Sequence, residues 1–262
     1  MFLRARIIRP SLTRQIPKAT SESRLKITLF IPCYVDALYP NVGVSMVKIF
    51  ERLGYSPEFD PSNVCCGQPP FNAGFWQEAR AIARPVLQRL SQAETIVVPS
   101  GSCGAMIRVF YRELFKDDPL SETAREVSLK TFEFSEFLVD QLQVTSLGSR
   151  FPAKVTFHDG CHGFRELKIK QQPRTLLANV AGLKLVEMAD QSTCCGFGGT
   201  FSVKFPMIST AMGDMKCAVA LETGAEYIVS NDSSCLMHLQ GLLSRQGRAI
   251  KTIHLAEILA SR

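Results

Sequence analysis

The sequence predicts an α/β fold that is internally duplicated, with two open parallel-sheet halves related by a pseudo-two-fold axis. Three observations support this class: strand-like and helical segments alternate, the same order of segments occurs twice, and cysteines follow matching strands in both copies. Strands that alternate with crossover helices are typical of parallel sheets. We expect a basic, disordered N-terminal extension over residues 1–24, a first half over 25–142 and a second half over 153–262.

Each half is expected to contain three apolar strands, with a pair of adjacent cysteines between the first strand and the second. The matching segments are LKITLFIPC (25–33) and AKVTFHDGC (153–161), VCCGQ (64–68) and TCCGF (193–197), AETIVVPSGSC (93–103) and AEYIVSNDSSC (225–235), and KTFEFSEFL (130–138) and KTIHLAEIL (251–259). Because four matches occur in the same order, we interpret them as a duplication.

Apolar residues at helical spacing lie between these strands in both halves. The helical segments are GVSMVKIFERLG (43–54), FWQEARAIARPVLQRLSQ (75–92), PRTLLANVAG (173–182) and PMISTAMGDMKCAVALETGA (206–225). The first of them stops at a glycine, which is a common helix end. The second contains Pro85, where we expect a kink or break because proline has no backbone N–H to donate.

Composition and charge exclude several classes of protein. The 46% hydrophobic and 21% charged residues are ordinary for a globular chain, and no apolar run is long enough to span a membrane. The net charge of +6 is concentrated in residues 1–24, so the rest is nearly neutral and a nucleic-acid-binding face is not expected. The basic leader lacks the apolar stretch of a secretory signal, which favours the cytoplasm, with an organellar transit peptide as the alternative.

The nine cysteines point to metal or redox chemistry. Their odd number and the missing secretory signal argue against a disulfide framework. Between the first cysteine and the cysteine pair lie 31 residues in the first half and 32 in the second. Eight cysteines follow this repeated spacing, namely Cys33, Cys65, Cys66, Cys103, Cys161, Cys194, Cys195 and Cys235. The ninth, Cys217, lies on a predicted helix outside the repeat, and we expect it to pack in the core.

Adjacent cysteines favour an iron–sulfur cluster over a single metal ion. Their side chains diverge, so two neighbours reach one tetrahedral ion poorly, whereas a cluster offers several metal atoms. Thiolates bind both zinc and iron–sulfur clusters, so zinc in one half stays an alternative. The carboxyl ends of parallel strands form the functional edge of such sheets. We therefore expect the cysteines to gather in two crevices, one in each half, near the interface between the halves.

The cysteine pattern resembles that of CCG cysteine-rich domain iron–sulfur proteins. That group includes a cysteine-rich component of heterodisulfide reductase, the glycolate oxidase iron–sulfur subunit and, most similar in its motifs, the lactate utilization protein A family. The motifs that carry the resemblance are CYVDALYPNVG, CCGQPPFNAG, VVPSGSCGAM, HDGCHGFRELKI, CCGFGGTFSVKFP and SNDSSCLMHL. They occur in order over about residues 25 to 262.

The resemblance implies an oxidoreductase component: an iron–sulfur subunit that takes part in the oxidation of L-lactate to pyruvate. It also implies one or two clusters of the 4Fe-4S type per chain and partner subunits that include a ferredoxin-type iron–sulfur protein. The family pattern ends each half in Cys-x-x-Cys, but here Ser100 and Asp232 stand at the first of those positions. Each half therefore offers four thiolates, with an oxygen ligand as an option at the fifth place.

The second half carries additional polar residues around its first cysteine. His158 and His162 flank Cys161, and Arg165 follows three residues later. A histidine near a cluster is a candidate ligand, proton carrier or hydrogen-bond donor, and an arginine is a candidate for binding a substrate carboxylate. We predict that these three residues make the second half the redox-active one, with a small hydroxyacid as substrate. Structural roles for them, another dehydrogenase or disulfide reductase, and a zinc-stabilised binding module stay open.

Overall fold

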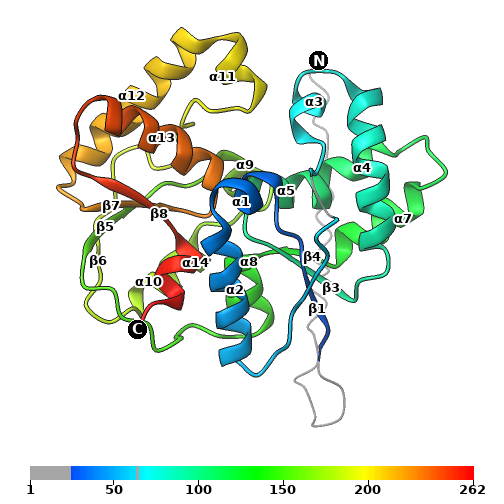
Figure 1. The fold of residues 1–262 in the computed structure, drawn as a ribbon, viewed down its shortest axis with the longest axis horizontal. Coiled ribbons are helices and arrows are strands. Elements are labelled where there is room, and N and C mark those ends of the chain that lie inside the picture. Colours follow the sequence, from blue (N-terminus) through cyan, green and yellow to red (C-terminus); the bar gives the residue numbers. More distant parts are fainter. Residues whose placement is uncertain (1–24, 63–64) are drawn as a thin grey trace, which may run out of the picture.

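Two four-stranded sheets, in which every strand pair is parallel, form the frame of the molecule (Figure 1). The computed structural model describes residues 25–62 and 65–262, so the basic extension predicted over 1–24 lies outside the described residues. The strand order is β2-β1-β3-β4 in the first half and β6-β5-β7-β8 in the second. The duplicated parallel α/β fold is thus confirmed.

The strands have the following bounds: β1 Ile27–Leu29, β2 Glu58–Phe59, β3 Thr95–Val98, β4 Thr131–Glu133, β5 Lys154–Phe157, β6 Lys184–Leu185, β7 Tyr227–Ser230 and β8 Lys251–His254. All but the two edge strands, β2 and β6, fall inside the segments predicted from the sequence. Each edge strand has two residues, which is too short to show a hydrophobic alternation. They form because β1 and β5 offer them a free parallel edge.

The first half contains α1 Cys33–Leu38, α2 Pro40–Arg52, α3 Gln68–Asn72, α4 Trp76–Leu90, α5 Gly101–Ala105, α6 Tyr111–Leu114, α7 Ser121–Leu129 and α8 Phe134–Glu136, with π-helical turns at Met106–Phe110 and Phe137–Gln141. The second half contains α9 Cys161–Arg165, α10 Gln171–Ala178, α11 Thr200–Lys204, α12 Pro206–Glu222, α13 Ser233–Arg245 and α14 Leu255–Ala260. The expected break at Pro85 is absent, because α4 continues through this residue.

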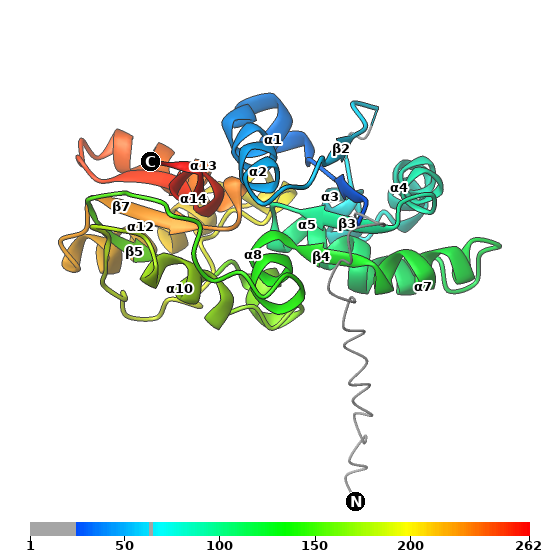
Figure 2. The same ribbon diagram turned by 90° about the horizontal axis from the view of Figure 1, so that it is seen from below.

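The halves are joined by helices that pack in exchanged pairs. Helix α2 packs against α14, and its counterpart α10 packs against α8, in the middle of the molecule (Figures 1 and 2). In the same way α1 contacts α13, and α9 contacts α5. Ile49 of α2 and Ile258 of α14 are fully buried in one shared core, and each such side chain contributes about 1.5–3 kcal/mol by leaving water. This exchange is what a pseudo-two-fold axis between the halves requires.

The helices also bear on membrane association. Within the described parts of the chain, none of them combines the length and the apolar character needed to cross a bilayer.

Candidate metal centre

The eight cysteines of the repeat line the same pocket, which lies between the two halves. The two crevices that the sequence predicted near the interface are thus joined in one pocket. The pairing of α5 with α9 and of α1 with α13 brings together the carboxyl ends of both sheets, from which these helices start. The sulfurs of the first half, which are Cys33, Cys65, Cys66 and Cys103, thus share a cavity with Cys161, Cys194, Cys195 and Cys235.

Within each half the sulfurs form a chain of short contacts. Cys66 Sγ lies 3.3 Å from Cys103 Sγ, and Cys195 Sγ lies 2.9 Å from Cys235 Sγ. The first cysteine of each half is hydrogen-bonded to the first member of the pair: Cys33 to Cys65, and Cys161 to Cys194. Four sulfurs from three segments of chain thus converge in each half, as ligands of one metal group must.

One cysteine in each half has the character of a thiolate. The Cys33 thiol and the Gly67 N–H, at 3.4 Å, donate to Cys65, and these contacts together with the neighbouring Cys66 lower the pKa of Cys65 to about 3. The same pattern lowers the pKa of Cys194 to about 2. The pKa values of the donating thiols rise correspondingly. These contacts favour the anionic form of Cys65 and Cys194, the form in which cysteine binds a metal.

The glycine after each cysteine pair lets the backbone N–H reach the first sulfur of that pair. Gly67 and Gly196 have φ values of +83° and +89°, a left-handed conformation that side chains disfavour. In addition, a Cβ atom at Gly196 would lie 2.5 Å from the Ser209 carbonyl oxygen. Only glycine lets the backbone N–H turn back toward the preceding sulfur while α12 packs close by.

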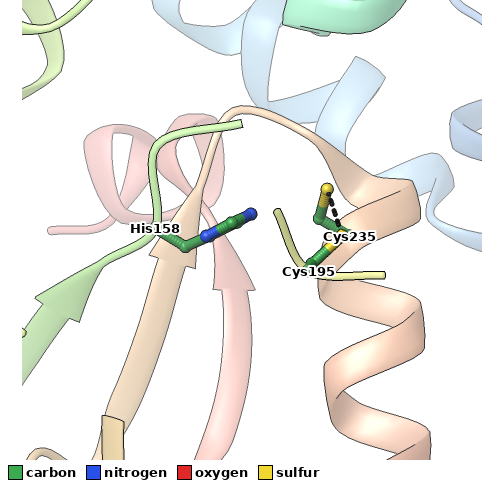
Figure 3. Close-up of side chains that lie close together, drawn as sticks. All are labelled: His158, Cys195 and Cys235. Atoms are coloured by element: carbon green, nitrogen blue, oxygen red, sulfur yellow. Dashed lines mark hydrogen bonds between the residues drawn. The ribbon is translucent and has the colours of Figure 1, made fainter. Parts of the chain in front are cut away.

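His158 follows β5 and lies beside two cysteines of the second half (Figure 3). One of its ring nitrogens, Cys195 Sγ and Cys235 Sγ all lie within 4.8 Å of one another. The imidazole is fully buried, and neither ring nitrogen makes a well-formed hydrogen bond, with only a weak interaction from the Gln191 backbone. Burial, assisted by the charge of Lys216, lowers the pKa of His158 to about 4, so the ring is neutral near pH 7.

His162 belongs to α9 and lines the pocket itself. Its Nδ1 lies 3.4 Å from Nε2 of Gln68, a residue of the first half. Gln68 Nε2 in turn donates to the Ser102 carbonyl at 2.9 Å. His162 is partly exposed, so it connects the cysteine pocket with solvent across the boundary between the halves.

Two further predicted residues lie outside the pocket. Arg165 ends α9, is exposed, and does not line the cavity that holds the cysteines. Cys217 is fully buried on α12 and packs in the core of the second half, in line with the packing role expected from the sequence. The described residues that line the pocket include neither arginine nor lysine, so they offer no cationic side chain for a carboxylate.

Ser100 and Asp232, at the fifth-ligand positions of the two halves, bind each other. Ser100 Oγ donates to Asp232 Oδ1 at 2.8 Å, and the Ser102 N–H donates to the same oxygen at 3.0 Å. Ser100 Oγ also accepts from the Cys103 N–H and thereby caps α5. Both residues are buried. The positions at which the sequence offered an oxygen ligand also tie the halves together, a pairing that sequence spacing alone did not reveal.

The sequence analysis also missed Lys216, a buried cation in the second half. This residue of α12 is 2% exposed, and its Nζ donates to the Asp190 carbonyl at 2.5 Å. Burial lowers its pKa, while Asp190 and Cys195 act in the opposite direction. Its position inside the apolar stretch MKCAVAL was the available signal.

The residues present fit an iron–sulfur group in three respects. The donor set consists of thiols, the soft ligands that such clusters take. The cavity has a volume of about 90 Å³. One water needs roughly 10–15 Å³, so the space suits a polynuclear group better than a lone ion. The unpartnered imidazole of His158 is a third sign, because a buried polar group normally has a partner.

Comparisons with known proteins agree with this site. The CCG cysteine-rich domain matches the chain twice, over residues 27–108 and 155–240. Similar proteins include Lactate utilization protein A of Bacillus thuringiensis (strain Al Hakam) and of Bacillus cereus (strain AH187). Each is 44% identical over 239 residues, which cover 91% of this chain and 100% of the relative.

Among solved structures, a hypothetical protein from Helicobacter pylori is similar to the whole arrangement. The TM-score is 0.56 at 13% sequence identity, over 92% of this chain and 51% of that chain. At this identity the likeness concerns the fold alone.

Proposed function

Because the chain belongs to the family of CCG cysteine-rich domain proteins that includes lactate utilization protein A, we propose that it is the iron–sulfur subunit of an L-lactate oxidising system. The observation that carries the proposal is the convergence of two four-cysteine sets in one pocket. We assign one 4Fe-4S-type cluster to each set. Such a cluster supplies one-electron redox chemistry when bound.

The number of sites matches the chemistry of the substrate. Oxidation of lactate to pyruvate releases two electrons and two protons, and the pocket has two ligand sets that share one cavity. We propose that the electrons pass on to a ferredoxin-type iron–sulfur partner. Since no arginine or lysine is among the described pocket-lining residues, carboxylate binding is assigned to a partner subunit.

His162 is the residue of this chain best placed to move a proton. It lines the pocket and is partly exposed, and imidazole is a side chain that proteins commonly use to carry protons. Gln68 Nε2 can only donate, so its contact at 3.4 Å makes Nδ1 the acceptor and puts the ring proton on Nε2. We place the complex in the cytoplasm, where thiols stay reduced and available as ligands.

The test is anaerobic purification followed by assays of iron and acid-labile sulfide. We expect both elements, with visible absorbance that dithionite bleaches. Cys195→Ser and Cys66→Ser should each remove about half of the iron, because each set holds its own cluster. Bound zinc without sulfide would contradict the proposal and favour a zinc-stabilised module.

Cys217→Ser is the matched control, since it alters a buried cysteine of the same half that does not line the pocket. It should leave the iron and sulfide contents unchanged. Reduction of the purified chain by lactate, in the presence of its partner subunits, then tests the substrate. Reduction by glycolate or glycerol 3-phosphate in place of lactate would assign the same scaffold to another dehydrogenase.

A further inference from the structure

We propose that His158 is a nitrogen ligand of the metal group in the second half, so that the two halves hold their groups with different ligand sets. The first half would bind through thiolates alone, and the second through thiolates together with one imidazole. This inference rests on the proposed function, because it requires a metal group at the cysteines. It adds a ligand that the cysteine pattern does not contain.

The surroundings of His158 are the first argument. A fully buried imidazole with two unpartnered nitrogens loses the hydrogen bonds that water would supply, and this loss destabilises the folded chain. The ring points from the end of β5 toward Cys195 and Cys235 (Figure 3). A metal bound at these sulfurs would give the ring the partner it lacks.

A second histidine in the same half shows what a structural role looks like. His254 is also buried at the end of a strand, yet both of its nitrogens are engaged. Nε2 lies 3.1 Å from the Pro99 carbonyl oxygen, and Nδ1 accepts from the Ala256 N–H to cap α14. Among these two histidines only His158 lacks any such bond. In this half, a buried histidine with a structural role thus has hydrogen-bond partners for both ring nitrogens.

The duplication supplies the third argument. The repeat aligns His158 with Phe30, one strand end with the other. Phe30 is fully buried in the apolar core of the first half, which also contains Cys66. The position therefore accepts a wholly apolar ring where only packing is needed. A polar ring at the same place in the second half has a purpose other than packing.

Pulsed EPR of the dithionite-reduced, iron-loaded protein tests the proposal, because a directly bound imidazole nitrogen gives a strong hyperfine coupling. We expect this coupling in the wild-type chain. It should disappear in His158→Phe, which copies the first half, and persist in His162→Ala, which alters the histidine that lines the pocket. Mössbauer spectra should show an iron subsite that differs from the all-thiolate ones, whatever the spin state.

His158→Cys is the control in case His158→Phe loses its bound iron. It offers a thiolate at the same position, and we expect it to retain iron while the nitrogen coupling and the distinct subsite vanish. The proposal is overturned if the iron-loaded wild type has neither signature, or if both survive in His158→Phe or vanish in His162→Ala. Absence of iron and sulfide from the wild type would instead overturn the proposed function together with this inference.

Discussion

The two halves share a frame but differ in the polarity of what surrounds their cysteines. The strand order and the sulfur contacts repeat closely. Phe30 of the first half is replaced by His158 in the second. A second correspondence comes from the glycines after the cysteine pairs. Gly67 contacts α4 and Gly196 contacts α12 at equivalent turns. When these turns are aligned, Val86 of α4 corresponds to Lys216 of α12. A histidine and a lysine thus stand where the first half is apolar.

The side-chain contacts between the two halves also differ in polarity. Tyr34 of the first half meets Phe197 edge-on, with ring centroids 5.6 Å apart. The corresponding pair, His162 and Gln68, is polar. Duplication has therefore kept the cysteines and the backbone, while the side chains around them diverged. Positive charge and hydrogen bonds near a cluster shift its reduction potential, so the clusters that we propose would have unequal redox properties in the two halves.

Among the predictions that test the difference between the halves, His162→Ala should have the largest effect. We expect it to lower lactate-dependent electron transfer by about 100-fold or more, the usual range for loss of a proton-transfer group, with unchanged iron content. Tyr34→Ala is the matched change in the first half and should have a much smaller effect. Loss of iron from His162→Ala would make this residue a ligand or structural support. If neither quantity changes, the polar asymmetry has no functional meaning.

The contact between Ser100 and Asp232 tests how strongly the halves depend on each other. Asp232→Ala removes the acceptor for the Ser100 hydroxyl and the Ser102 N–H, both at the buried boundary. We expect a loss of about 3 kcal/mol in the free energy of unfolding, measured by urea denaturation of the metal-free chain. Asp232→Asn keeps an acceptor oxygen and should lose less. Equal stability of Asp232→Ala and wild type would show that the boundary does not need this bond.

The helices that follow the last strand of each half are capped by an acid in the first half and by a base in the second. The contributions of these two caps to stability should therefore respond to pH in opposite directions. Glu133 and His254 each form a capping box. Burial raises the pKa of Glu133 from 4.5 to about 8, so the folded state holds this proton more tightly and stability falls as pH rises across that interval. Burial lowers the pKa of His254 below 6.5, so stability falls as pH drops through that region.

Glu133→Gln separates the two effects. Above about pH 8 the variant should be more stable than the wild type by about 2 kcal/mol, because the buried amide carries no charge. Near pH 4.5 the difference should be small. Urea denaturation at both pH values measures it, and an unchanged decline of stability in alkali would assign that decline to other groups.

Much of the fold was readable in the sequence because the relevant signals are local. Apolar alternation placed β1, β3, β5 and β7, and helical periodicity placed α2, α4 and α12. The edge strands β2 and β6 were missed because each forms only by pairing with a neighbour that is distant in sequence. The break expected at Pro85 is absent because packing of α4 outweighs the loss of one hydrogen bond.

The sequence by itself determined the duplication, the eight cysteines and their position after parallel strands, because repetition and spacing are properties of the chain. Only the tertiary structure decided that both cysteine sets share one pocket, that Ser100 binds Asp232, and that Arg165 lies outside the site. It also separated two buried histidines of similar setting, one with partners and one without. These outcomes depend on how the halves pack against each other, and side chains that meet across that boundary leave no periodic trace in either half.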